Sequence, residues 1–284
     1  LLVTSVVSFA WLLWHELHTE EPVIDFHLLK NRQLATGVLM GSVLGFALFG
    51  SIFVLPVFLQ TLHGFTANQT GMVILPGAMA SAMTMALIGR RLRLLPDGRP
   101  VILLGASLFM VCMYQLSALT FDSGAANLFW PLIIRGVALG LIFIPLNSIA
   151  LAELAPRDLA QGTGLFNLMR QLGGSMGIAI MATMLSRFTK EKKGLLTDHM
   201  VAIAPDVQAR LEGLTHALTA TGASAGVAHQ QALMIMDRTV TGQASVLAFS
   251  RIYWISGLVL LCATPLMLFW HSGRPRGMPV RDSH

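Results

Sequence analysis

One charged side chain, Arg135, lies well inside a long apolar stretch of the sequence. If that stretch spans a membrane, the charge is costly and should face the interior of a helix bundle or a water-filled cavity. A guanidinium stays protonated at accessible pH values, so Arg135 cannot itself release a proton. It can pair with a nearby acid and lower the pKa of that acid, which makes Arg135 a candidate functional residue. The alternative is an arginine that is structurally paired or that reaches toward a membrane surface.

The other residue patterns that suggest catalytic or metal chemistry are incomplete. The run His15-Glu16-Leu17-His18 lacks the two residues that a zinc-protease helix places between the Glu and the second His. Cys112 and Cys262 lie in separate apolar segments, which is typical of packing residues and not of a disulfide framework. The apolar segments hold no cluster of Asp, Glu, His or Ser of the kind that an intramembrane enzyme needs. We therefore expect no catalytic site, no bound metal and no cofactor.

The composition indicates which elements must position Arg135. Of the 284 residues, 54% are hydrophobic and 12% are charged, and the mean hydropathy is +0.67. A soluble domain has about 25% charged residues. Five segments contain no Asp, Glu, Lys or Arg at all: 33–89, 100–121, 136–152, 171–186 and 252–273. Because about 20 apolar residues cross a bilayer core as a helix, the fold class is a polytopic all-α membrane protein, and soluble enzymes, nucleic-acid modules and disulfide scaffolds are disfavoured.

The apolar segments predict six complete transmembrane helices. The segment at 33–89 is too long for one span and divides near Gly64, where turn and cap residues follow one another. We place the six spans at 35–60, 69–89, 100–121, 127–151, 166–186 and 250–270. The apolar run at 1–15 is too short for a complete span, and we expect the end of a truncated helix there.

The distribution of Lys and Arg predicts the orientation of the spans, because basic residues collect in cytoplasmic loops. The loops at 61–68 and 122–126 contain neither residue, whereas those at 90–99 and 152–165 do. The connector at 16–34 and the tail at 271–284 are therefore expected in the cytoplasm. The same alternation of loops places the basic segment 187–249 on the extracytoplasmic side of the membrane. This placement is acceptable because long loops translocate regardless of charge. We expect it to be a long extracytoplasmic loop with two partly helical arms, the second of which runs toward the last span.

Small and aromatic residues recur within these spans. Gly37, Gly41 and Gly45 occupy every fourth position, as do Gly173 and Gly177, a spacing that lets helix backbones approach closely. Static packing and a sliding interface both explain such spacing. Phenylalanines at 46, 49 and 53 are candidates to line an apolar cavity, although lipid-facing packing explains them equally well. Prolines inside the predicted spans are expected to kink them: Pro56, Pro76, Pro145 and Pro265.

Several motifs resemble those of a known transporter family. The loop from Gly89-Arg90 to Asp97-Gly98-Arg99-Pro100 resembles the loop signature of the major facilitator superfamily, and Arg135-Gly136 with Gly140 is similar to its arginine motif. Three further stretches resemble the fourteen-helix drug:proton antiporters of the EmrB/QacA type. They are Glu21-Pro22-Val23-Ile24-Asp25, the run from Phe143 to Ser148, and Gly164-Leu165-Phe166-Asn167 followed by Arg170 to Gly177.

The resemblance implies the C-terminal six-helix bundle of a proton-coupled multidrug exporter that works by alternating access. It implies that 35–60 and 127–151 line a central cavity, with Phe46, Phe49, Phe53 and Asn147 toward substrate and Arg135 toward proton coupling. It also implies that 69–89 and 166–186 meet the other half, with interface glycines at 173, 174 and 177, and that 100–121 and 250–270 are peripheral. A conformational loop follows from the same resemblance, formed by Gly89, Arg90, Asp97, Gly98 and Arg99.

The expected partners are the lipid bilayer, amphipathic drug-like substrates, protons and an N-terminal half of the same transporter. A periplasmic adaptor stays open as a partner, and nucleic acid is not expected. Two alternatives keep the membrane fold: an exporter of a lipid, siderophore or metabolite, and a membrane scaffold that transports nothing.

Overall fold

A computed structural model of the chain describes residues 26–91, 97–120, 123–202, 204–222 and 224–269, together with six single residues before residue 16. The described residues form helices and no strand, which confirms the predicted all-α class. The elements are η1 (Phe26–Lys30), α2 (Arg32–Leu62), α3 (Ala67–Arg91), α4 (Arg99–Ser117), α5 (Ala125–Leu151), α6 (Leu159–Ala202), α7 (Ala204–Ala220), α8 (Ala225–Ala263) and η3 (Thr264–Phe269). The tail at 271–284, the first part of the connector and nine of the fifteen residues at 1–15 lie outside the described residues.

Polar caps fix the beginnings of the first two long helices. The Asn31 side chain accepts hydrogen bonds from the backbone amides of Gln33 and Leu34, at 2.8 and 3.2 Å. Thr66 and Gln69 form a reciprocal capping box at the beginning of α3, with distances of 2.9 and 3.3 Å. Gly64 supplies the positive φ of 66° that the turn between α2 and α3 needs. The predicted break of the 33–89 segment therefore lies where its cap chemistry indicated.

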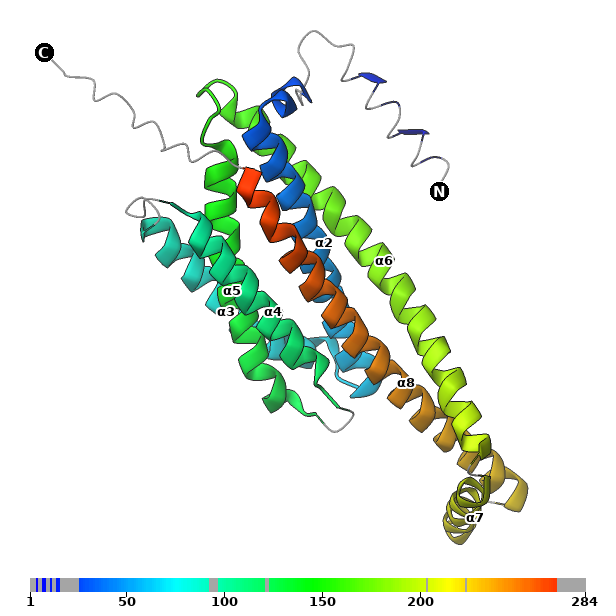
Figure 1. The fold of residues 1–284 in the computed structure, drawn as a ribbon. Coiled ribbons are helices and arrows are strands. Elements are labelled where there is room, and N and C mark those ends of the chain that lie inside the picture. Colours follow the sequence, from blue (N-terminus) through cyan, green and yellow to red (C-terminus); the bar gives the residue numbers. More distant parts are fainter. Residues whose placement is uncertain are drawn as a thin grey trace, which may run out of the picture.

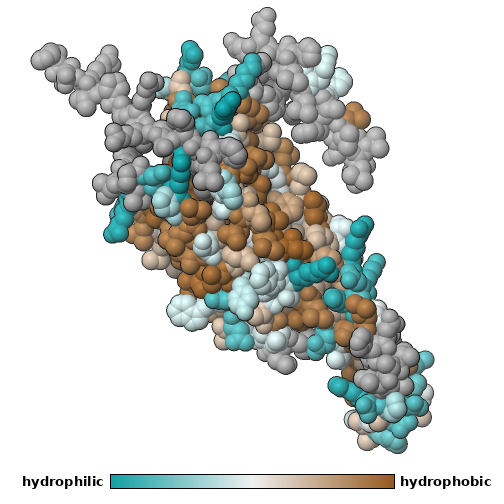
Figure 2. Space-filling view, viewed as in Figure 1, coloured by the Kyte–Doolittle hydropathy of each residue, from teal (hydrophilic) through white to brown (hydrophobic). Residues whose placement is uncertain are grey.

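The helices pack as a bundle in which α2 and α5 are central (Figure 1). Helix α6 packs along α2, and α3 packs along α5, while α4 and α8 pack on each other and on the central pair. Five described helices are long and apolar enough to cross a membrane: α2, α3, α4, α5 and α8. Figure 2 shows the apolar surface as a band along the bundle, with hydrophilic residues toward its two ends. These features identify a multi-pass membrane protein.

Helix α6 differs from the predicted span at 166–186. It begins seven residues earlier, at Leu159, and continues to Ala202. It is not one of the five strongly apolar helices, although it packs along α2 like a bundle member. Its first residues were expected to belong to the loop at 152–165, but Gly162 is helical and its amide donates to the Asp158 carbonyl at 2.9 Å. The earlier start moves Arg170 from the edge of the predicted span to a position inside the helix.

Segment 187–249, expected as a long loop with two partly helical arms, is helical over nearly all of its described length. We call α6 beyond Arg187, α7 and the first half of α8 the stalk, which projects from one end of the bundle (Figure 1). Ion pairs tie its two long arms together, with Lys193 Nζ 2.6 Å from Asp237 Oδ1 and Arg251 Nη1 3.8 Å from Glu191 Oε1. These pairs join residues far apart in the sequence, so spacing alone did not predict them.

The last predicted span, 250–270, also needs correction. Its α-helix is the continuation of the second stalk arm and ends at Ala263, after which Thr264–Phe269 form a 3-10 helix. Pro265 therefore lies just past the α-helix and does not kink its interior, because proline cannot supply the amide that the next turn needs.

Candidate functional site

The predicted interface glycines lie between α6 and α2. A methyl group added to Gly173 or Gly177 would fall on the backbone carbonyl of Ser42 or of Phe46, and one added to Gly174 would fall on the ring of Phe49. These glycines therefore hold two helices of the same bundle in close contact. In the structure these glycines face α2. Their contact with the other half of a transporter, which the resemblance implies, stays a prediction.

Arg135 is buried in α5, with 6% of its surface exposed. Its neighbours include Cys112 of α4 and Tyr253 of α8. The Cys112 thiol donates to the carbonyl of Pro131, one turn before Arg135, at 3.0 Å. Within the described part of the chain, neither Arg135 Nη1 nor Tyr253 Oη has a hydrogen-bond partner. This Arg135 cluster of three residues lies inside the bundle. The role of Arg135 that the resemblance implies stays a prediction.

A second arginine at depth, Arg170, lies at the contact of α6, α2 and α5. Its guanidinium carbon is 5.8 Å from the ring centroid of Phe49 and 5.3 Å from that of Phe143. Its Nη2 donates to Oδ1 of Asn167 at 3.3 Å, while its buried Nε has no partner among the described residues. We call Arg170, Asn167, Phe49 and Phe143 the Arg170 cluster. The sequence reading missed its depth, and the only available signal was its place in the motif that continues to Gly177.

The predicted cavity residues are distributed around this cluster. Phe49 belongs to it, and Phe46 and Phe53 are half-buried on the same helix. Asn147 is half-buried one turn beyond Phe143, and its Oδ1 has no hydrogen-bond partner in the described structure. The structure thus brings Phe49 near a cation, a neighbour that the sequence reading did not assign to it.

The predicted conformational loop joins α3 to α4, and residues 92–96 within it lie outside the description. Gly89 and Arg90 are in the last turn of α3, and Gly98 is buried at the beginning of α4. Asp97 Oδ1 accepts a hydrogen bond from the Arg99 amide at 3.1 Å and lies 3.8 Å from Arg99 Nε. Asp97 therefore caps α4 locally, which is compatible with either a latch or a plain turn.

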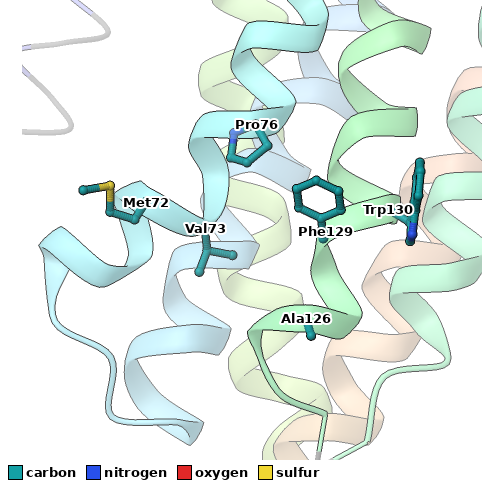
Figure 3. A pocket seen from close by; sticks show the side chains of 6 residues that line it. All are labelled: Met72, Val73, Pro76, Ala126, Phe129 and Trp130. Carbon is teal, nitrogen blue, oxygen red and sulfur yellow. The ribbon is translucent and has the colours of Figure 1, made fainter.

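A separate pocket of about 520 Å³ lies between α3 and α5, lined by Met72, Val73, Pro76, Ala126, Phe129 and Trp130. In Figure 3 the ring of Phe129 points from α5 toward Pro76 of α3. Because its lining side chains are apolar, this pocket suits an apolar group and offers nothing to orient a polar one. None of the predicted cavity residues lines it.

The helical bundle is that of a multi-pass membrane protein, and the chain belongs to the major facilitator superfamily. The family model described as Major Facilitator Superfamily matches residues 1–178. The EmrB/QacA resemblance of the motifs is confirmed by the relatives that the chain matches.

Three of these relatives are bacterial resistance or export proteins. The "Multidrug export protein EmrB" of Escherichia coli K12 is 32% identical over 98% of this chain and 52% of its own length. The "Fatty acid resistance protein FarB" of Neisseria gonorrhoeae is 24% identical over 95% of this chain and 52% of its own length. The "Colistin resistance protein EmrB" of Acinetobacter baumannii is 26% identical over 89% of this chain and 49% of its own length. The chain spans about half the length of the curated relatives it matches.

Proposed function

We propose that this chain is the C-terminal half of a proton-coupled multidrug exporter that works by alternating access. The observation that carries the proposal is the pairing of a major facilitator bundle with two deep arginines and half-buried phenylalanines on its central helices. The names of the three relatives support export of amphipathic compounds. Transporters of this kind move one helix bundle against another around a site near the middle of the membrane.

The surface of α3 supports docking against another bundle. Only Thr70 and Gly77 of this 25-residue helix are buried. Large apolar side chains are exposed along it at helical spacing: Met72, Leu75, Met79, Met83 and Leu87. An apolar helix face suits either lipid or a second helix, and in our proposal part of this face meets the other half of the transporter. Substrate then binds between the halves, near Phe46, Phe53 and Asn147.

We also propose an orientation for the bundle. The loops that contain Arg90, Arg91 and Arg157 lie at one end of the bundle, and the stalk projects from the other (Figure 1). Because basic loops stay in the cytoplasm, the stalk is extracytoplasmic and the C-terminal tail is cytoplasmic. The stalk is then the part of this chain available to an adaptor protein outside the membrane.

Proton coupling is assigned to Arg135 together with a carboxylate elsewhere in the full-length transporter. Among the described residues, Arg135 Nη1 has no hydrogen-bond partner. A deep charge of this kind needs water or an opposite charge. A guanidinium does not give up its proton, so Arg135 acts by changing the proton affinity of another group.

Transport by the full-length protein in proteoliposomes tests the proposed function. A pH gradient should drive accumulation of ethidium in the direction opposite to proton flow, and an uncoupler should abolish it. A panel that adds lipid, siderophore and metabolite cargoes separates multidrug export from the narrower alternatives. Ethidium movement that ignores the gradient would contradict proton coupling, and no movement of any cargo would favour a membrane scaffold.

A further inference from the structure

Arg170 lies at a depth where a charged side chain needs a reason to be present. Helix α6 begins eleven residues before it, at Leu159, which corresponds to roughly 17 Å at about 1.5 Å per residue. A bilayer core is only about 30 Å thick. Since an arginine near the centre of a membrane helix costs several kcal/mol, such residues usually have a partner and a function.

The surroundings of Arg170 leave part of its hydrogen-bonding capacity unused. The neighbouring rings of Phe49 and Phe143 stabilise the cation, with ring centroids less than 6 Å away. A guanidinium has five N–H donors, yet the one side-chain hydrogen bond that Arg170 makes to a described residue goes to the neutral amide of Asn167, at 3.3 Å. Its Nε is buried and has no acceptor among the residues described.

No carboxylate of the surrounding helices is placed to neutralise this charge. Helices α2 and α5 contain no Asp or Glu, and the first acidic residue of α6 is Glu191. Glu191 follows Arg170 by 21 residues, or roughly 30 Å along the helix, and is already 3.8 Å from Arg251. The negative charge must therefore come from outside these helices.

We propose that the Arg170 cluster binds one carboxylate group. A carboxylate matches the planar fork of guanidinium donors better than any other common anionic group except phosphate. The flanking rings of Phe49 and Phe143 would pack on the apolar body that carries it. The carboxylate belongs either to an amphipathic substrate, which rests on the proposed export function, or to an acidic side chain of the full-length protein outside this chain.

Binding to the purified full-length protein in nanodiscs distinguishes these sources without measuring transport. The probes are decanoate, decanol and decylamine, which share an apolar chain and differ in charge, and empty nanodiscs are subtracted to remove partitioning into lipid. The variants are Arg170→Gln, which removes the charge, and Arg170→Lys, which keeps the charge but loses the planar fork. Arg251→Gln is the matched control, because Arg251 also lies over a ring, that of Phe188 at 4.3 Å, but has Glu191 as its partner.

A substrate carboxylate predicts that Arg170→Gln weakens decanoate binding at least tenfold and leaves decanol binding unchanged. Arg170→Lys should show an intermediate loss, and the Arg251→Gln control should bind decanoate like the wild type. A protein carboxylate predicts unchanged decanoate binding and a melting temperature of the ligand-free protein several degrees lower in Arg170→Gln, largely restored in Arg170→Lys. If Arg170→Gln changes neither quantity, there is no carboxylate site. Failure of the proposed function is a separate result, seen as the absence of gradient-driven ethidium transport by the wild type.

Discussion

The contact of α2 with α6 predicts a specific cost for adding one methyl group at Gly173. The ideal Cβ of an alanine there would lie 2.6 Å from the Oγ of Ser42 and 2.7 Å from its carbonyl carbon. Ordinary contacts are at 3.4–4 Å, so the two backbones would have to separate by close to 1 Å. Overpacking of this kind costs about 1–3 kcal/mol. Gly173→Ala should therefore lower the free energy of unfolding, although alanine is the better helix former by about 1 kcal/mol.

Gly194→Ala is the matched control, because Gly194 lies in the same helix and its added methyl meets nothing within 4 Å. We expect this control to be neutral or slightly stabilised, because only the helix propensity changes there. The assay is thermal unfolding of the full-length protein in detergent, monitored by fluorescent size-exclusion chromatography. Gly173→Ala should melt several degrees below both the wild type and the control. Equal melting temperatures for the three proteins would refute close backbone contact at this point.

Three further predictions concern orientation, the α3–α4 loop and Arg135. In a cysteine-free background, single cysteines at the exposed positions Asn68 and Gly124 should react with an impermeant thiol reagent in intact cells. A cysteine at the exposed position Arg157 should react only after permeabilisation. Labelling of position 157 in intact cells would reverse the orientation. Asp97→Asn keeps an acceptor for the Arg99 amide, so the abundance and stability of the full-length protein should change little. Transport should fall if Asp97 latches one conformation. Unchanged transport would mean that the loop is a plain turn. Arg135→Ala should leave membrane insertion intact, because the substitution removes a buried charge. In the full-length protein it should shift the pH profile of export. An unchanged pH profile would mean that Arg135 is purely structural.

Much of the fold was predictable because membrane helices are recorded in local composition. Charge-free segments located the helices, and the turn and cap residues near Gly64 indicated where the 33–89 segment divides. The beginning of α6 was not predicted in this way, because its first residues were expected to belong to the loop at 152–165. Two partly helical arms were expected in the stalk, but the extent of their helices was underestimated, since their pairing depends on contacts such as Lys193 with Asp237.

The candidate site was predictable in residue type more than in arrangement. An isolated charge in an apolar helix identified Arg135, but the sequence does not say which side of α5 faces α4. Arg170 was undervalued because its depth depends on where α6 begins. Phe49 was predicted as a cavity residue, but its contact with the Arg170 guanidinium was not predicted. That contact brings together positions 49, 143 and 170, which lie in three different helices.

Arg135 and Arg170 have different surroundings, and we propose different roles for them. Arg135 is almost fully buried with Cys112 and Tyr253. Arg170 is only partly buried, between two rings and beside a neutral amide. Helices α2, α4 and α5 contain no Asp or Glu, and the acidic residues of α6 and α8 lie in the stalk. A transporter that exchanges protons for an organic compound needs one site sensitive to protonation and one in contact with substrate. In our proposal the surroundings of Arg135 have the first role, and the Arg170 cluster has the second where its carboxylate belongs to substrate. Helix α5 would then couple the two roles, because it contributes both Arg135 and Phe143.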